Sequence, residues 1–203
     1  MNILQIDSSV LGDNSVSRSL TASIVADLVT RNPGAKVTVR DLDREAPAHL
    51  GNHLLPVLGG PKDGLNAVQQ AELDRTETLL AEFMAADVLV IGAPQYNFSI
   101  PSQLKAWIDA LAVPGKTFRY TPAGAQGLLG DKRVVIVSSQ GGFYTPGTPM
   151  GAFEHQESHL SSFFRFLGVT DIQVVRAEGV KMGPEAGDRV QAALRQAAEL
   201  EVA

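Results

Sequence analysis

Short apolar segments alternate with segments of helical periodicity along the chain, and this alternation most constrains the fold. Strands are expected at five places: Ile3–Asp7, Lys36–Leu42, Asp87–Gly92, Lys132–Ser138 and Val169–Glu178. Apolar residues recur at helical spacing in five further segments: Ser17–Thr30, Leu65–Ala86, Ile100–Ala112, Phe153–Leu167 and Pro184–Leu200. Strands that alternate with helices predict an α/β fold with a parallel sheet and right-handed crossovers.

The hydrophobic pattern of each strand indicates its position in that sheet. The second strand alternates apolar and polar residues, which is typical of a half-exposed edge strand. The first, third and fourth strands have the continuously apolar pattern of buried parallel strands. We therefore predict a doubly wound, five-stranded parallel sheet of order 2-1-3-4-5, with helices on both faces, in a single domain of residues 1–203.

Two irregular segments interrupt this alternation. Residues 43–64 are rich in proline and glycine, and they include His49 and His53, which have no partner pattern. Residues 113–130 form an insertion with four glycines and two prolines. The insertion is compatible with a small hairpin, and the first segment is a long connection of the kind that is often functional.

Composition excludes several classes of site and partner. The chain has no cysteine, which rules out disulfides, thiolate metal centres, Fe–S clusters and a cysteine nucleophile. Its 17 Lys and Arg against 22 Asp and Glu give a net charge of −5, so we expect no nucleic-acid partner. The apolar runs are too short to span a membrane, and the first residues lack the pattern of a signal peptide. We expect a cytoplasmic protein with no membrane partner.

The loop after the first strand is rich in hydroxyl groups. In sheets of this order, ligands bind at the carboxyl ends of the strands, so the loops that start at Ser8, Ala93 and Ser139 are the candidates. The first loop leads directly into a helix N-terminus, which favours a phosphate, and Ser9, Ser15 and Ser17 would add donors. It has no lysine for a γ-phosphate, so a terminal monophosphate that is only held suits it. Ser15 or Ser17 as a simple N-cap is the open alternative.

The loop after the third strand carries two aromatic residues. Tyr96 and Phe98 lie in Ala93–Ser99, where they could form walls for a flat ring. The alternative, which is more plausible for one aromatic than for both, is that Phe98 packs under the next helix.

The loop after the fourth strand contains paired glycines. Gly141 and Gly142 would let backbone amides approach a ligand and face a ring carbonyl. The alternative is an ordinary flexible turn. Together the three loops describe a ligand with a terminal phosphate and a planar heteroaromatic ring, which is the shape of FMN. NAD(P) would also need a place for adenosine and, normally, a glycine-rich fingerprint that this chain lacks.

Five stretches of the chain resemble the FMN-dependent NADH-azoreductases, which are also NAD(P)H:quinone oxidoreductases of flavodoxin-like fold. The stretches occur in the expected order over nearly the whole chain: Ser8-Ser9 with Ser15-Val16-Ser17, Ala-Pro-Gln-Tyr-Asn-Phe at 93–98, Thr-Phe-Arg-Tyr-Thr at 117–121, Ser-Gln-Gly-Gly at 139–142, and Ala-Glu-Gly at 177–179. Tyr-Asn-Phe followed by Thr-Phe-Arg-Tyr is quite specific. Relatives often have Met where this chain has Gln95, a basic residue at Gln140, and His at Tyr144.

The resemblance implies a set of site residues and partners. The implied FMN contacts are Ser9, Ser15, Val16, Ser17, Gln95, Tyr96, Asn97, Phe98, Ser139, Gln140, Gly141 and Gly142. The candidate walls of the substrate pocket are Phe98, Tyr120, Tyr144 and Phe163, some of them crossing from a partner subunit. We expect a homodimer with one FMN per subunit. NAD(P)H would reduce the flavin, and a quinone or azo compound would then accept hydride at the same place, which gives ping-pong kinetics.

Three alternatives remain beside this hypothesis. A flavodoxin-type electron carrier would share the fold, although such carriers are typically smaller and strongly acidic. A quinone reductase that uses FAD would share the chemistry. His155 and His159 have the spacing of a helical zinc site, but Gln156 stands where the zincin pattern needs Glu. No third ligand is evident, so we expect no metal.

Overall fold

The computed structural model describes residues 1–52, 54, 55, 58 and 63–200, and it contains a parallel sheet of five strands. The spatial order is β2 (Lys36–Asp41), β1 (Asn2–Asp7), β3 (Val88–Pro94), β6 (Arg133–Ser139) and β7 (Asp171–Ala177). In chain order this is 2-1-3-4-5, because β4 (Phe118–Thr121) and β5 (Gly124–Gly127) form a separate antiparallel hairpin. The predicted sheet and the hairpin in the insertion are confirmed.

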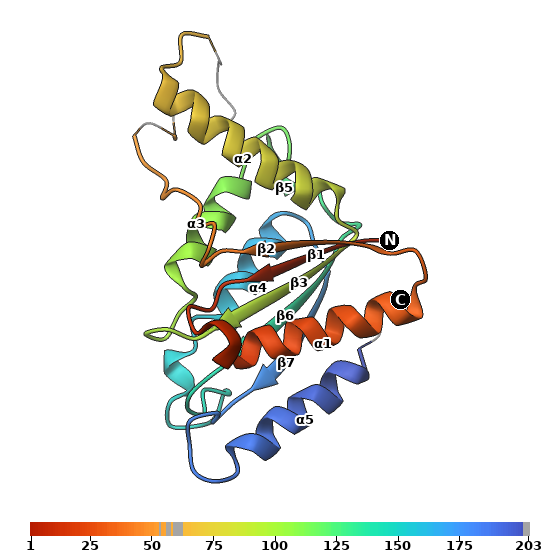
Figure 1. The fold of residues 1–203 in the computed structure, drawn as a ribbon. Coiled ribbons are helices and arrows are strands. Elements are labelled where there is room, and N and C mark those ends of the chain that lie inside the picture. The colour runs from red at the N-terminus through yellow and green to blue at the C-terminus, as the bar shows by residue number, and fades with distance from the viewer. Residues whose placement is uncertain (53, 56–57, 59–62, 201–203) are drawn as a thin grey trace.

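Helices cover both faces of the sheet (Figure 1). One face carries α1 (Val16–Arg31) and α5 (Ala186–Ala198), which contact each other. The other face carries α2 (Ala67–Ala85), α3 (Ser102–Leu111) and α4 (Glu157–Phe166). Each layer of helices buries its own apolar cluster against the sheet. All seven residues of β3 are buried, which explains why this segment is a continuous apolar run.

The exposure of β2 and the packing of α3 against α2 both agree with the apolar pattern of the sequence. The first four residues of β2 are exposed, as its alternating pattern predicts for an edge. Trp107 of α3 is fully buried, and its ring lies edge-on to Phe83 of α2 with the centroids 6.0 Å apart. An aromatic pair of this kind fixes the packing of two neighbouring helices beyond the area that it buries.

The start of α4 differs from the sequence-based expectation. The apolar pattern predicts a helix from Phe153, but Gly151–Phe153 form a 3-10 turn and α4 begins at Glu157. The Glu154 carboxylate accepts hydrogen bonds from the backbone N–H of Gln156 at 2.7 Å and of Glu157 at 2.6 Å, so it caps the helix there. The connection 43–64 has no helix or strand among its described residues, and His53 lies outside them.

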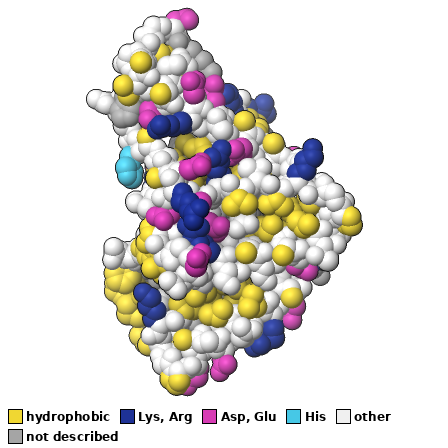
Figure 2. All heavy atoms as spheres, in the orientation of Figure 1, with side chains coloured by type: hydrophobic (Ala, Val, Ile, Leu, Met, Phe, Trp, Pro, Cys, Tyr) yellow, Lys and Arg dark blue, Asp and Glu magenta, His cyan; other side chains and the backbone are white. Residues whose placement is uncertain are grey.

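No helix in the described part of the chain is long and apolar enough to cross a membrane. On the face shown in Figure 2, basic and acidic side chains lie beside one another in the upper and middle part of the view, so this face has no continuous basic surface.

The hairpin lies close to the end of α4, and glycine is required at that contact. A Cβ atom on Gly127 would lie 2.1 Å from the backbone of both Leu167 and Gly168. Gly187, near the start of α5, has nothing within 4 Å of the corresponding position.

We predict that Gly127→Ala destabilises the protein by about 1–3 kcal/mol, because backbone must move to admit the methyl group. The matched control, Gly187→Ala, should raise stability by up to about 1 kcal/mol, because it removes freedom from the unfolded chain. Urea denaturation of both variants measures the two effects. Equal stabilities of the two variants would contradict this account of the hairpin.

Candidate functional site

A cavity of about 400 Å³ opens at the carboxyl edge of the sheet. Residues from the loops after β1, β3 and β6 line it, and the segment after β7 contributes Val180 and Lys181. This edge is where ligands bind in doubly wound sheets, and the volume lies within the range of small-molecule sites. The three predicted loops therefore do meet at one cavity.

The first loop presents the N-terminus of α1 to this cavity. Ser15 is the N-cap, and its hydroxyl accepts a hydrogen bond from the Arg18 N–H at 3.2 Å. Ser9, Ser15 and Val16 line the cavity, whereas Ser17 is fully buried with its hydroxyl 3.1 Å from that of Ser15. Ser15 is thus an N-cap and also faces the cavity, so its role in binding a ligand stays a prediction. The first N–H groups of a helix have no intrahelical partners, so this end can hold an anion.

Two serine hydroxyls fix the first loop against the loop after β3. The Ser8 hydroxyl donates to the Gly92 carbonyl at 2.6 Å, which ties the end of β1 to β3. The Ser9 hydroxyl lies 3.2 Å from the Tyr96 hydroxyl and accepts a hydrogen bond from the Leu11 N–H at 3.3 Å. The loop after β1 and the loop after β3 are therefore in direct contact.

The second loop contributes all four of its predicted residues, Gln95–Phe98, to the cavity. Asn97 and Phe98 have positive φ angles of 48° and 72°. Such a backbone costs about 1–3 kcal/mol for a non-glycine residue and is concentrated at functional sites. Phe98 is 41% exposed, and its ring lies beside those of Tyr144 and Phe153, with centroids 6.3 Å and 5.2 Å away. Phe98 thus belongs to an aromatic wall, and the alternative that it packs under the next helix is wrong.

The third loop is held firmly by the segment that follows β7. The N–H groups of Gly179, Val180 and Lys181 donate to the carbonyls of residues 142, 140 and 141 at 2.9, 3.1 and 3.3 Å. The Glu178 carboxylate also accepts hydrogen bonds from the N–H groups of Tyr144 and Thr145, at 2.6 and 2.7 Å. The alternative of an ordinary flexible turn therefore does not describe this loop. Ser139, Gly141 and Tyr144 line the cavity, whereas Gln140 and Gly142 do not.

Two buried side-chain amide atoms on these loops lack partners among the described residues. Gln140 donates to the Gln156 side chain at 3.1 Å, but its own Oε1 atom has no partner. The Nε2 atom of Gln95, a residue that lines the cavity, is also buried without one. Unsatisfied buried polar atoms are rare and costly in folded proteins. The open donor of Gln95 would fit a bound ring that carries a carbonyl oxygen, whereas Gln140 does not line the cavity.

The other predicted residues lie away from the cavity of this chain. Tyr120, on β4, is 75% exposed, and Phe163 packs against the core cluster beneath α4. Neither lines the cavity, so a role for either in the substrate pocket would need a second chain and stays a prediction. The described residues contain no group of three His, Cys, Asp or Glu side chains that could hold a metal ion, His155 and His159 included.

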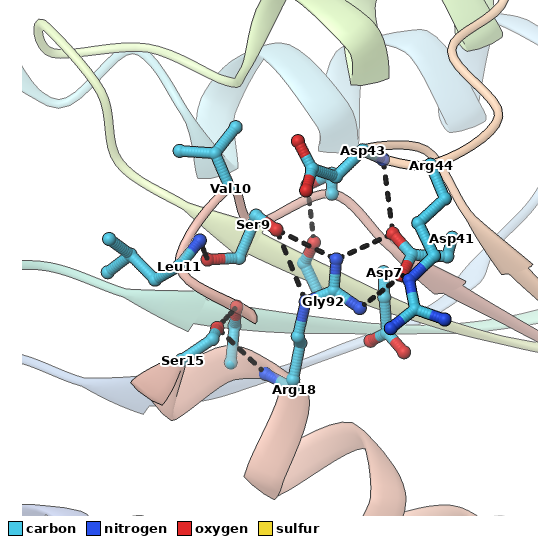
Figure 3. Close-up of polar contacts among 12 residues, drawn as sticks. Asp7, Ser9, Val10, Leu11, Ser15, Arg18, Asp41, Asp43, Arg44 and Gly92 are labelled. Atoms are coloured by element: carbon cyan, nitrogen blue, oxygen red, sulfur yellow. Dashed lines mark hydrogen bonds and ion pairs between the residues drawn. The ribbon is translucent and has the colours of Figure 1, made fainter. Parts of the chain in front are cut away.

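A buried carboxylate lies beneath the first loop (Figure 3). Asp7, at the end of β1, is 5% exposed, and it accepts hydrogen bonds from the Thr21 hydroxyl at 2.7 Å and the Gln5 amide at 2.8 Å. Burial raises the pKa of the Asp7 carboxyl above its ordinary 3.8, and the two hydrogen bonds only partly offset this.

This raised pKa predicts a pH-dependent stability. The folded state holds the Asp7 proton more tightly than the unfolded chain does, so its stabilising contribution is complete below pH 3.8 and is lost as the pH rises through the folded pKa. Asn has no proton to lose, so Asp7→Asn should gain stability relative to wild type as the pH rises from 3.8 through the pKa of the folded state. Urea denaturation over that range measures the gap, with Asp13→Asn on the nearby exposed turn as control. A gap that stays constant or shrinks as the pH rises would refute this assignment.

Comparison with known proteins identifies the family. A family model described as "Flavodoxin-like fold" matches residues 1–200. The chain is 68% identical to the FMN-dependent NADH:quinone oxidoreductase 1 of Cupriavidus pinatubonensis (strain JMP 134), over 92% of this chain and 89% of that protein. The chain belongs to the FMN-dependent NADH:quinone oxidoreductase family. The family resemblance and the flavodoxin-like fold expected from the sequence are thereby confirmed.

Solved structures with the same fold support this assignment. An azoreductase from Bacillus anthracis str. Sterne is 29% identical and superposes with a TM-score of 0.89, covering 98% of this chain and 97% of that one. An FMN-dependent NADH-azoreductase from Bacillus anthracis str. Ames Ancestor, solved in complex with FMN, is 27% identical and has a TM-score of 0.86, with the same coverage of both chains. The proteins similar to this chain are thus named as quinone oxidoreductases and as azoreductases.

Sequence reasoning missed several residues of the site. Leu11, Asn14 and Pro94 line the cavity within loops that were singled out, but Val180 and Lys181 come from a segment that was not. The carboxyl-edge rule could have found these two, because they follow the fifth strand of the same parallel sheet. Nothing in the local pattern indicates that Glu178 holds the third loop.

Proposed function

We propose that this chain is an FMN-dependent NADH:quinone oxidoreductase that also reduces azo compounds. The observation that carries the proposal is that the three loops meet at one cavity, which is lined by Ser15 and Val16 at the start of α1, by the aromatic residues Tyr96, Phe98 and Tyr144, and by Gly141. The family assignment supports the cofactor, the donor and the quinone acceptor, and the structural neighbours described as azoreductases support the azo acceptor.

Each loop would hold a different part of FMN. Ser9, Ser15 and the first N–H groups of α1 would bind the phosphate, since an anion is favoured at that end. Gln95 and the loop to Phe98 would border the ring, with the free Gln95 amide available for a ring carbonyl. The Gly141 amide would face the ring where negative charge gathers on reduction. Ser17, Gln140 and Gly142 would act from behind the cavity wall.

FMN supplies the redox chemistry, namely uptake of hydride from NADH and its delivery to the acceptor. The protein's own residues bind, orient and shield. Tyr144 and Phe98 would cover the ring from the side of the third loop, and Glu178 would keep Tyr144 in place. Because donor and acceptor would use the same exposed face in turn, we expect ping-pong kinetics.

We further propose that the working unit is a homodimer with one FMN per subunit. Tyr120 of β4 is 75% exposed and Phe166 of α4 is 43% exposed, and both rings contact the buried Phe118, so a second chain could cover this apolar surface. A second chain could bring Tyr120 or Phe163 to the cavity, which neither reaches in its own chain. A cytoplasmic location and the single-domain organisation stay predictions.

The proposal predicts that the purified protein binds FMN at about one per chain and then oxidises NADH when a quinone is added. Flavin fluorescence quenching measures the binding, and the loss of NADH absorbance measures turnover. FAD and NADPH serve as matched alternative ligands, and FMN without protein serves as the blank.

Three outcomes would contradict the proposal. A protein that takes up no FMN would refute the assignment of the cavity. A protein that binds FMN but does not oxidise NADH faster than the blank would instead be a carrier of the flavodoxin type, and one that prefers FAD would be the other class of quinone reductase.

A further inference from the structure

An arginine joins the first loop to the end of the neighbouring strand β2 (Figure 3). The Arg18 guanidinium donates from Nε and Nη2 to the Ser9 carbonyl, at 3.2 and 2.8 Å. The same group donates from Nη1 and Nη2 to the two carboxylate oxygens of Asp41, at 2.8 and 2.5 Å. The Arg18 side chain thus fixes the direction of the Ser9 carbonyl relative to the end of β2.

The pair of charges is sheltered and well oriented. The side chains of Arg18 and Asp41 are only 18% and 21% exposed. The hydrogen bonds from Arg18 hold the pKa of the Asp41 carboxyl below its usual value, so the carboxylate is charged at neutral pH. Asp41 also accepts the Asp43 N–H at 3.1 Å, which fixes its orientation from its own strand end. Bidentate arginine–carboxylate pairs of this kind add geometric specificity to their energy.

The carbonyl that Arg18 holds is next to the place proposed for the phosphate. Ser9 lines the cavity, whereas Arg18 does not. A loop binds phosphate through N–H and O–H donors, and a carbonyl oxygen that turned toward the anion would repel it. With the Ser9 carbonyl engaged by Arg18, the loop is left to present its donors to the cavity. Any effect of Arg18 on a ligand would therefore pass through Ser9.

We propose that Arg18, oriented by Asp41, is a positioning residue for the phosphate end of FMN. It keeps the Ser9 carbonyl out of the phosphate site, and it acts through geometry because Asp41 neutralises its charge. This inference rests on the proposed function, since it assigns a role within the same FMN site.

The first test compares FMN with riboflavin, which has the same ring and no phosphate. Arg18→Gln should raise the Kd for FMN by about tenfold or more, the effect of a lost charge-assisted hydrogen bond, while the Kd for riboflavin changes by less than about twofold. Fluorescence quenching measures both constants. An unchanged Kd for FMN, or equal losses for the two flavins, would overturn the proposal, because a purely structural role would not depend on the phosphate.

The chain offers a matched control at Arg40, the residue that precedes Asp41 on β2. Arg40 makes a similar two-pronged pair with Glu82, at 2.7 and 2.5 Å and with 22% and 21% exposure, but it joins β2 to α2. Arg40→Gln should therefore destabilise the fold about as much as Arg18→Gln in urea denaturation. Its Kd for FMN should stay at the wild-type value. A loss of FMN affinity equal to that of Arg18→Gln would overturn the proposal.

A third variant separates geometry from charge. Asp41→Asn keeps the size of the side chain but removes the carboxylate that orients Arg18. If Arg18 positions the loop, the Kd for FMN rises in this variant as in Arg18→Gln. If Arg18 instead attracted the phosphate by its charge, loss of the neutralising Asp41 would lower the Kd, and that result would overturn the proposal. Failure of the wild-type protein to bind FMN would refute the proposed function itself, which is a distinguishable outcome.

Discussion

The burial of the central strands on both faces is the constraint on which the rest of this structure depends. All seven residues of β3 are buried, and β6 is buried except at its first residue, so helices occupy the space on either side of the sheet. A ligand can then approach the sheet only where the strands end. Because all five strands are parallel, their carboxyl ends lie at one edge, and the loops after them meet there whatever their own sequences. The cavity follows from the sheet, and its chemistry follows from the loops.

Much of the fold could be predicted because buried parallel strands have continuously apolar sequences. The edge position of β2 followed from its alternating residues, four of which are exposed. The start of α4 could not be predicted in the same way. Phe153 continues the apolar pattern of the helix, but its ring packs against Phe98 from another loop, with centroids 5.2 Å apart. The cap by Glu154 then sets the helix start, and such a competition depends on tertiary contacts.

In the candidate site, too, local features could be predicted from the sequence and long-range contacts could not. Serine-rich, aromatic and glycine-rich loops could be recognised locally, because each carries its chemistry within a few residues. The contacts that hold these loops join residues far apart in sequence: Arg18 with Asp41, and Tyr144 with Glu178. No local pattern reports such a pair, so the sequence indicated what the loops offer and not what keeps them in place. The absence of cysteine is consistent with chemistry that the flavin would carry.

The most direct test of the central claim is a ¹⁵N–¹H NMR titration of the protein with FMN. The claim is that one flavin lies across the loops after β1, β3 and β6. It predicts that the largest amide shift changes map to residues 9–17, 95–98 and 139–144, and that inorganic phosphate alone perturbs only the first of these segments. Largest changes elsewhere would contradict the account. Another cavity, of about 420 Å³ between β2 and α2 and lined in part by Arg40, Arg44 and Arg75, is the clearest such place.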